Sequence, residues 1–373
     1  MSDKSQVALY IDPPTYHFLG DGLFDSATAP HGGDDILAPY RLIREHFKSH
    51  GIDVHTADLL GPEAEGKRNI YVSMGMQARY AELAQRGDTV LSGFFAMECP
   101  IVEPSLYRGL PAVGRVFRRV FSWSDGDALR PFTGHRMKFE SFRWPQCFDG
   151  VHEEIWSRTQ HRKFMVMINA NKLPRLYQNE LYTKRLAAVE FFHRHGEIDL
   201  YGRHWERVPI RLGKPTWMPW TVVKMSERLR QLKQIVLPNP IYTAARAASH
   251  GPAASKSKTM GDYRFALCFE NMILKGWITE KLFDCFFVGT VPIYWGDPAI
   301  EKAVPPACYI DMRQFRDFAQ LRDFLKGLSR EQIESYRQAA RCFLESPSFR
   351  PFSSRAFLDI FRRLVREDAG VDV

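Results

Sequence analysis

The 373-residue sequence contains no run of about 18 apolar residues, which is the length a membrane-spanning helix needs. Its first segment, MSDKSQVALYIDPP, has no basic stretch followed by a long apolar run, so it does not resemble a signal peptide. Both absences predict a soluble chain without a membrane anchor. We therefore expect a cytoplasmic protein.

Cysteine is scarce, and its spacing excludes the common metal motifs. The six residues are Cys99, Cys147, Cys268, Cys285, Cys308 and Cys342. No two of them form a C-x-x-C pair, and several stand in apolar runs. This pattern favours reduced, buried thiols over disulfides or a structural zinc site.

Blocks of basic residues are also absent, although the net charge is +8. No five Lys or Arg residues stand together, and no zinc-finger or RNA-recognition spacing occurs, so we expect no nucleic acid partner. A dispersed positive charge still attracts small anions such as nucleotide diphosphates, acidic glycans or anionic headgroups.

The chain is too long for one ordinary core, and its pattern indicates two domains. Short apolar runs alternate with amphipathic segments in the first half, and the alternation restarts after about residue 155. Each half therefore predicts a mostly parallel sheet covered by helices. Expected strands are 7–11, 52–55, 69–73, 89–96, 163–168, 198–201, 264–269 and 291–295. Expected helices include 34–50, 76–85, 180–195 and one that begins near Thr279.

The C-terminal region leaves two interpretations open. Ser329 and Gln332 fit a capping box, and a later helix places Phe357, Phe361 and Leu364 on one face, with arginines opposite. That apolar stripe suits packing in the core, but a basic amphipathic helix on an anionic membrane has the same pattern. Residues 244–258, AARAASHGPAASKSK, are predicted to form a surface loop.

The most informative stretch is 263–311. A buried strand ends in Glu270-Asn271, and Thr279 is a good N-cap for the following helix. The amide groups at that helix N-terminus, with Lys281 in the first turn, suit a diphosphate. Glu280 in the same turn is placed to accept hydrogen bonds from a ribose, although a carboxylate there also simply stabilises the helix dipole.

This stretch resembles the donor-site signature of family 10 glycosyltransferases, the α1,3/α1,4-fucosyltransferases. The family pattern is F-E-N, an aromatic residue six positions later, T-E-K, and V-P-I-Y-W-G-x-P. It is matched by residues 269–271, Trp277, 279–281 and 291–298. The resemblance spans about residues 88–315 and is strong over 263–311. It implies a GDP-fucose site built by Asn271, Trp277, Glu280 and Lys281.

One departure from the family pattern concerns the donor. The family usually has tyrosine at the position of Trp277, so this chain keeps the ring and loses the phenolic hydroxyl. A different nucleotide sugar, another GDP-sugar or one like UDP-galactose, therefore stays open as the donor.

The resemblance also implies an arginine that reaches the donor phosphates and a glutamate that acts as general base. Arg185 and Arg175 are the two candidates for the arginine, and Arg185 is preferred because it leads the apolar run LAAVEFF. Glu98 in the segment FFAMECP is the candidate base, with Glu103 as runner-up. A carboxylate between apolar neighbours has a raised pKa and is a better base.

The expected architecture is the GT-B arrangement, two Rossmann-like domains facing each other across a cleft. Residues 1–155 would bind the acceptor, residues 156–345 would bind the GDP-sugar, and the helix within 346–373 would pack back on the domain junction. The D-G-D sequence at Asp125–Asp127 is interpreted as a turn and not as a metal site, so no metal cofactor is expected.

The predicted function is inverting transfer of L-fucose from GDP-β-L-fucose to a hydroxyl of a glycan. The alternatives are another nucleotide-sugar donor, or a non-catalytic protein that binds a nucleotide sugar or glycan, which would need no base at Glu98. The acceptor would suit assembly of a bacterial surface glycan, including one on a lipid carrier or lipopolysaccharide core. Peripheral contact with the inner face of the membrane belongs to the same hypothesis.

Overall fold

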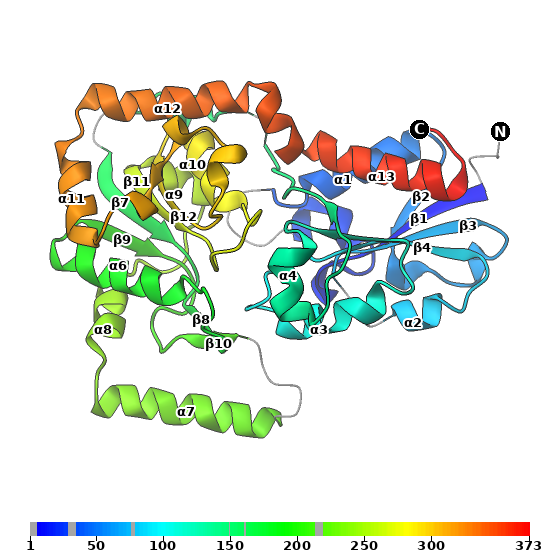
Figure 1. The fold of residues 1–373 in the computed structure, drawn as a ribbon, viewed down its shortest axis with the longest axis horizontal. Coiled ribbons are helices and arrows are strands. Elements are labelled where there is room, and N and C mark those ends of the chain that lie inside the picture. Colours follow the sequence, from blue (N-terminus) through cyan, green and yellow to red (C-terminus); the bar gives the residue numbers. More distant parts are fainter. Residues whose placement is uncertain (1–5, 29–34, 76–78, 149, 160–161, 213–218) are drawn as a thin grey trace.

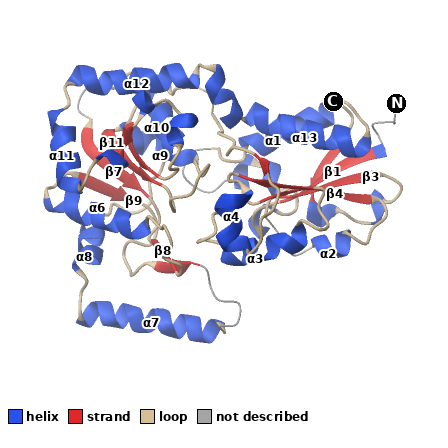
Figure 2. Cartoon of the chain, viewed as in Figure 1, coloured by secondary structure: helices blue, strands red, loops and turns tan. Residues whose placement is uncertain are grey.

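The computed structural model describes residues 6–28, 35–75, 79–148, 150–159, 162–212 and 219–373, and shows two α/β domains side by side (Figures 1 and 2). Two helices were predicted to begin at Asp34 and at Met76, and both of these residues lie outside the described part of the chain. Within the described part of the chain, no helix combines the length and the apolar character needed to cross a membrane.

The N-terminal domain is built on a six-stranded parallel sheet in the order β2-β1-β3-β4-β5-β6. Its strands are β1 Val7–Asp12, β2 Asp53–Thr56, β3 Arg68–Ser73, β4 Thr89–Phe95, β5 Arg119–Ser122 and β6 Glu140–Ser141. Its helices are α1 Ala38–Ser49, α2 Tyr80–Leu83, α3 Pro104–Val113 and α4 Gly126–Thr133.

The C-terminal domain has a five-stranded parallel sheet in the order β13-β12-β11-β7-β9 and a small two-stranded sheet of β8 and β10. The strands are β7 Lys163–Ile168, β8 Lys172–Pro174, β9 Ile198–Tyr201, β10 Ile210–Leu212, β11 Tyr263–Phe269, β12 Val291–Trp295 and β13 Ile310–Asp311. The helices are α5 Glu153–Trp156, α6 Tyr182–Arg194, α7 Trp220–Val236, α8 Pro240–Ala247, α9 Lys256–Gly261, α10 Glu280–Val288, α11 Phe318–Gly327 and α12 Arg330–Leu344.

The two main sheets share one topology. Numbered within its own domain, each begins with the strand order 2-1-3-4-5, so the direction of winding reverses beside the first strand. In the C-terminal domain this reversal lies between β7 and β11. Ligands of open α/β sheets bind outside the carboxyl ends of the strands at such a point. The GT-B class predicted from the sequence is confirmed.

The chain returns to the N-terminal domain through its last helix, α13 Ser354–Ala369, which lies along the upper side of the molecule in Figure 1. We expected this helix at the domain junction, but it packs further into the N-terminal domain, on α1, β3 and β4. Phe361 lies parallel to Phe95 of β4 with 5.9 Å between ring centroids. Burying a phenylalanine contributes roughly 1.5–3 kcal/mol, so the apolar stripe is used inside the protein and not on a membrane.

Two further local predictions have different outcomes. The capping box is confirmed: the Ser329 hydroxyl accepts from the backbone N–H of Gln332, and the Gln332 side chain accepts from that of Ser329. The surface loop predicted over 244–258 is wrong at both ends, because α8 extends to Ala247 and α9 begins at Lys256. Small residues such as alanine are good helix formers, and Ser255 caps α9 by accepting from the N–H of Lys258.

Candidate active site

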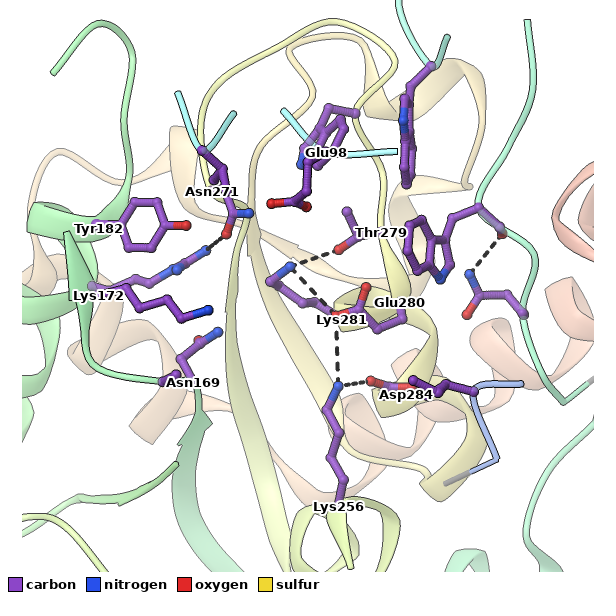
Figure 3. Close-up of a pocket in the computed structure, with 18 of the residues that line it drawn as sticks. Glu98, Asn169, Lys172, Tyr182, Lys256, Asn271, Thr279, Glu280, Lys281 and Asp284 are labelled. Carbon is purple, nitrogen blue, oxygen red and sulfur yellow. Dashed lines mark hydrogen bonds and ion pairs between the residues drawn. The ribbon is translucent and has the colours of Figure 1, made fainter. Parts of the chain in front are cut away.

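A cavity of about 490 Å³ lies between the domains, within the usual range for small-molecule sites. Both domains line it (Figure 3). Its polar side chains come from loops at the carboxyl ends of β4, β7 and β11, from the strand β8, and from the first turns of α6, α9 and α10. The lining residues used below are Glu98, Trp123, Trp144, Asn169, Lys172, Tyr182, Arg185, Lys256, Asn271, Trp277, Thr279, Glu280, Lys281 and Asp284.

The C-terminal wall is organised by Glu270, which directly follows β11 and is fully buried. Its carboxylate accepts from the backbone N–H of Thr279 at 2.8 Å, from the Thr279 hydroxyl at 2.9 Å and from the Lys281 ammonium at 3.2 Å. A buried carboxylate needs such partners to offset the loss of hydration. These bonds fix the start of α10 against the end of β11.

Thr279 occupies the N-cap position of α10 as predicted, but its side chain makes no capping hydrogen bond. The hydroxyl is used for Glu270 instead. The Thr279 side chain therefore does not cover the amide groups in the first turn of α10, and such amides are the groups that bind phosphate at helix N-termini.

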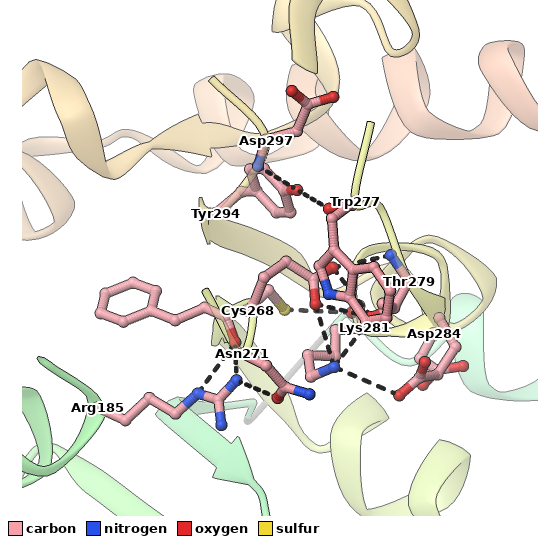
Figure 4. Close-up of polar contacts among 12 residues, drawn as sticks. Arg185, Cys268, Asn271, Trp277, Thr279, Lys281, Asp284, Tyr294 and Asp297 are labelled. Carbon is pink, nitrogen blue, oxygen red and sulfur yellow. Dashed lines mark hydrogen bonds and ion pairs between the residues drawn. The ribbon is translucent and has the colours of Figure 1, made fainter. Parts of the chain in front are cut away.

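Arg185 of α6 is buried in the same wall (Figure 4). Its Nε and Nη2 donate to the carbonyl oxygen of Phe269 at 3.0 and 2.6 Å, and Nη2 also donates to Oδ1 of Asn271 at 3.1 Å. The guanidinium lies over the ring of Tyr182, with 4.6 Å from Cζ to the ring centroid. Arg185 is thus held rigidly at the cavity edge, whereas Arg175, the other candidate, does not line the cavity.

Four charged side chains alternate along the floor of the cavity. The ammonium of Lys256 pairs with Asp284 and lies 3.9 Å from Oε1 of Glu280, and that of Lys281 lies 3.7 Å from the same oxygen. Burial opposes ionisation of Glu280, but Lys281 and Lys256 outweigh it and lower its pKa. Burial likewise opposes the charge of Lys281, yet Glu270 and Glu280 raise its pKa. Both groups are therefore charged at neutral pH.

Lys256 and Lys172 are functional candidates that the sequence analysis missed. Lys256 lay inside the segment predicted to be a loop, and the serine cap before it was the available signal. Asn169, which follows β7, lines the cavity, whereas Asn171 turns away and donates to the carbonyl oxygens of His204 and Arg207 at 3.0 and 2.7 Å.

Gly202, which follows β9, keeps the loop at Asn169 in place. Its φ is +142°, and a Cβ at this position would lie 1.9 Å from the carbonyl oxygen of Asn169. The indole N–H of Trp205 donates to that same oxygen at 2.7 Å. Only glycine permits this approach, which brings the loop after β7 to the cavity edge.

The N-terminal wall presents Glu98, three residues after β4. Tyr107 holds its backbone by donating to the carbonyl oxygen of Glu98 at 2.6 Å. Burial raises the pKa of the Glu98 carboxyl to about 7; Lys281 lowers it in part, and Glu103 and Glu280 add to the rise. In Figure 3 the carboxylate points toward Asn271 and Lys281 across the cavity. Glu103, the runner-up, is exposed before α3 and does not line the cavity.

Trp277 joins the two walls. It is 1% exposed and its ring centroid lies 4.2 Å from that of Trp123, which in turn stacks on Trp144 at 5.0 Å. Within the described residues its indole N–H has no hydrogen-bond partner. Beside it, a Cβ on Gly276 (φ +81°) would lie 2.1 Å from the carbonyl oxygen of Trp123, so the domains meet there at backbone distance.

Asp125 takes part in this domain contact. Its carboxylate accepts from the N–H of Ala128 at 2.9 Å, which caps α4, and from the ammonium of Lys275 at 2.7 Å. The D-G-D sequence thus starts a helix. Among the described residues, no group of three or more His, Cys, Asp or Glu side chains could hold a metal ion.

Residues 213–339 match the family model described as glycosyltransferase family 10 (fucosyltransferase), C-terminal. The similarity to glycosyltransferase family 10 thus lies within the C-terminal domain and covers about a third of the chain. An α-(1,3)-fucosyltransferase of Helicobacter pylori is 38% identical over 74 residues, which cover 20% of this chain and 16% of that protein. An α-(1,4)-fucosyltransferase of Arabidopsis thaliana is 34% identical over 87 residues, 23% of this chain and 22% of that protein. The matched region thus spans about a fifth of these relatives.

Solved structures are similar at low sequence identity. A crystal structure of an α1,3-fucosyltransferase with GDP-fucose is 13% identical, with a TM-score of 0.47, over 98% of this chain and 92% of that one. A UDP-forming trehalose-phosphate synthase from Burkholderia xenovorans is 12% identical, with a TM-score of 0.44, over 94% of this chain and 85% of that one.

Proposed function

We propose that the protein is an inverting fucosyltransferase that uses GDP-β-L-fucose and a glycan hydroxyl. The observation that carries this proposal is the shared cavity: a half-buried carboxylate, Glu98, faces a cationic wall that contains Arg185 and Lys281. A group transfer from a nucleotide sugar needs both parts, a base for the acceptor and positive charge for the departing diphosphate.

The donor would lie on the C-terminal wall. The first-turn amides of α10, the Lys281 ammonium and the Arg185 guanidinium suit the diphosphate, because each offers donors to anionic oxygens. Asn271 accepts from Arg185 through its side-chain oxygen, and one N–H of its NH₂ group is used for Cys99, which leaves the second N–H for the ligand. Glu280, kept ionised by two lysines, suits the ribose hydroxyls.

Glu98 would act as the general base. It takes the proton from an acceptor hydroxyl, whose oxygen forms a bond to the anomeric carbon while the bond from that carbon to the diphosphate breaks. A single displacement inverts the configuration, so the β-linked donor gives an α-linked product. A pKa of about 7 suits a base that works near neutral pH. The acceptor is proposed to be a glycan.

Trp277 favours a second candidate function, transfer of another nucleotide-linked sugar. A buried indole N–H normally has a partner, and here none exists within the described residues. Since Trp277 lines the cavity, the ligand can supply that partner. An indole donor in place of a phenolic hydroxyl changes which donor atoms are recognised, so the sugar or the base of the nucleotide could differ.

Thermal shift with GDP, UDP, GDP-fucose and GDP-mannose, each with and without EDTA, tests the proposal. A ligand at about 100 times its Kd stabilises the folded state by about 2.7 kcal/mol, so GDP and GDP-fucose should raise Tm by at least about 2 °C in both conditions. A shift with UDP alone would favour the second candidate, and a shift abolished by EDTA would contradict a metal-free site. Transfer is then followed with the preferred donor on a panel of glycans.

A further inference from the structure

Helix α7 exposes a continuous apolar stripe that nothing in the described chain covers. It lies at the lower edge of the C-terminal domain, below β10 in Figure 1. The α7 apolar stripe consists of residues that alternate by three and four positions: Val222, Met225, Leu229, Leu232 and Val236. Their exposed fractions are 40%, 59%, 60%, 57% and 76%. Single exposed hydrophobic residues are common on protein surfaces, whereas a continuous exposed apolar patch of this kind is typical of an interaction site.

The opposite face of α7 attaches the helix to the domain, which fixes the stripe outward. Val223 is buried, the guanidinium of Arg230 donates to the carbonyl oxygen of Pro209 at 3.0 Å, and the side-chain oxygen of Gln231 accepts from the N–H of Val208 at 3.3 Å. At 100° per residue these side chains lie on the side of the helix away from the stripe. The stripe therefore faces outward because the polar face is the one that contacts the protein.

The residues beside the stripe are basic. Lys224 and Arg228 border one edge and Lys233 borders the other, and all three are exposed. Pairing with a second copy of the helix would bring like charges together, because Arg228 and Lys233 occupy the heptad positions that flank the stripe and face a partner helix. Parallel pairing would place Arg228 of one copy against Lys233 of the other, and antiparallel pairing would place each against itself. An anionic surface instead attracts both edges.

We propose that α7 docks the protein on an anionic lipid surface, with the α7 apolar stripe at the boundary between headgroups and acyl chains. The long side chains of Lys224, Arg228 and Lys233 would extend from the stripe edges to the headgroup phosphates. The proposal goes beyond the proposed function, because docking requires neither donor binding nor turnover.

Co-sedimentation of the full chain with vesicles tests the docking. The vesicles are phosphatidylcholine alone, or phosphatidylcholine with about 30% phosphatidylglycerol. The wild-type protein should bind the anionic vesicles at least about tenfold more tightly than the neutral ones, and less tightly in high salt, because headgroup attraction is screened within a Debye length. Equal or absent binding to both vesicle types would overturn the proposal.

Three variants locate the effect. Leu229→Glu with Leu232→Glu should weaken anionic vesicle binding at least about tenfold, because it places charge in the apolar boundary. Arg228→Gln with Lys233→Gln should weaken anionic vesicle binding by about fivefold or more, because the attraction of these two cations to the headgroups is lost. Leu59→Glu changes an exposed leucine of the N-terminal domain (40% exposed) in the same way and should leave binding unchanged.

Two readouts separate docking from other causes. Far-UV circular dichroism and the GDP thermal shift should be the same for all variants, so a loss of vesicle binding is not a loss of folding or of the donor site. Light scattering should show that the wild-type protein forms no dimer through the α7 apolar stripe, and therefore the same mass for the wild type and for Leu229→Glu with Leu232→Glu. Such a dimer, or wild-type vesicle binding by that variant, would overturn the assignment of the stripe to lipid.

Discussion

The C-terminal wall of the cavity is a network of charged hydrogen bonds, whereas the N-terminal wall presents one carboxylate beside apolar side chains. On the C-terminal side Glu270 alone accepts from three groups, and Arg185 makes three hydrogen bonds. On the N-terminal side, no described side chain donates a hydrogen bond to the Glu98 carboxylate. The first wall is preorganised to hold charge, and the second keeps a reactive group without a partner until a ligand arrives. Substitutions in the two walls should therefore have different consequences.

The largest effect should follow from Glu98→Gln. The amide cannot take a proton, so kcat should fall by about 10²- to 10⁴-fold, while the affinity for GDP stays within about twofold because the C-terminal wall is intact. Steady-state kinetics and calorimetric GDP binding measure the two quantities. Glu103→Gln is the matched control and should retain activity; a loss there instead would transfer the role of base to Glu103.

Glu270→Gln should mainly destabilise the protein. The substitution keeps the shape but removes the buried charge that pairs with Lys281, and breaking a buried ion pair costs about 3–5 kcal/mol. Urea unfolding at pH 7 gives this free energy. Glu280→Gln, in the partly exposed first turn of α10, should cost less than about 1 kcal/mol. Equal losses from both would show that the Glu270 network does not anchor α10.

Arg185→Lys should weaken GDP binding and leave Glu98 chemistry in place. Lysine keeps the charge but not the planar fork that bonds Phe269 and Asn271 together. A hydrogen bond to a charged group is worth about 1.5–3 kcal/mol, so the Kd for GDP should rise by about tenfold to a hundredfold. Arg175→Lys, at the other candidate arginine, should leave the Kd unchanged, and the reverse result would exchange their roles.

The raised pKa of Glu98 predicts a pH-dependent difference in stability between the wild type and Glu98→Gln. Folding raises this pKa from 4.5 to about 7, so the folded wild type keeps a proton that the unfolded chain loses above pH 4.5. The wild type therefore loses stability progressively between pH 4.5 and about 7, and this loss is complete above pH 7, whereas Glu98→Gln has no ionisable group at this position. The variant should be more stable at pH 8 by up to roughly 3 kcal/mol, with no difference near pH 4. Chemical denaturation at both values measures this, and a less stable variant at pH 8 would contradict the raised pKa.

The smallest effect should come from the ion pair that joins the two walls at the surface. Lys275 and Asp125 are 59% and 47% exposed, and such pairs are weak and screened by salt. Lys275→Ala and Asp125→Ser, the latter keeping an N-cap side chain for α4, should each shift Tm by less than about 2 °C. The double variant measures the coupling. A strong, salt-insensitive coupling would show that this pair, and not the Trp123–Trp277 contact, holds the domains together.

Much of the C-terminal wall could be predicted because it is local. Asn271, Trp277, Glu280 and Lys281 lie within one strand–helix unit, and a parallel sheet places such a unit at the carboxyl edge whatever surrounds it. Their positions around the cavity agree with that expectation, whereas their roles stay predictions. Lys256 and Lys172 could not be found in this way, because they reach the cavity from other elements, the start of α9 and the strand β8.

The helices α13 and α7 show the limit of periodicity. Both carry an apolar stripe with basic residues nearby, and the membrane interpretation was left open for the last helix only. The structure buries the stripe of α13 on α1 and the N-terminal sheet and leaves that of α7 exposed. A repeat of three and four positions shows that a helix has an apolar face; which surface covers that face depends on packing between elements far apart in sequence.

Glu98 combines both kinds of information. Its type and its place between a buried strand and Pro100 are properties of the sequence, as are the β-α-β order of each domain and the residues of the 269–298 signature. Its pKa of about 7 is not, because the burial that raises it and the Lys281 charge that opposes it come together only when the two domains close over the cavity. Residue type and periodicity are determined by the sequence. Solvation and the proximity of charges depend on distances in space, and those distances exist only in the folded protein.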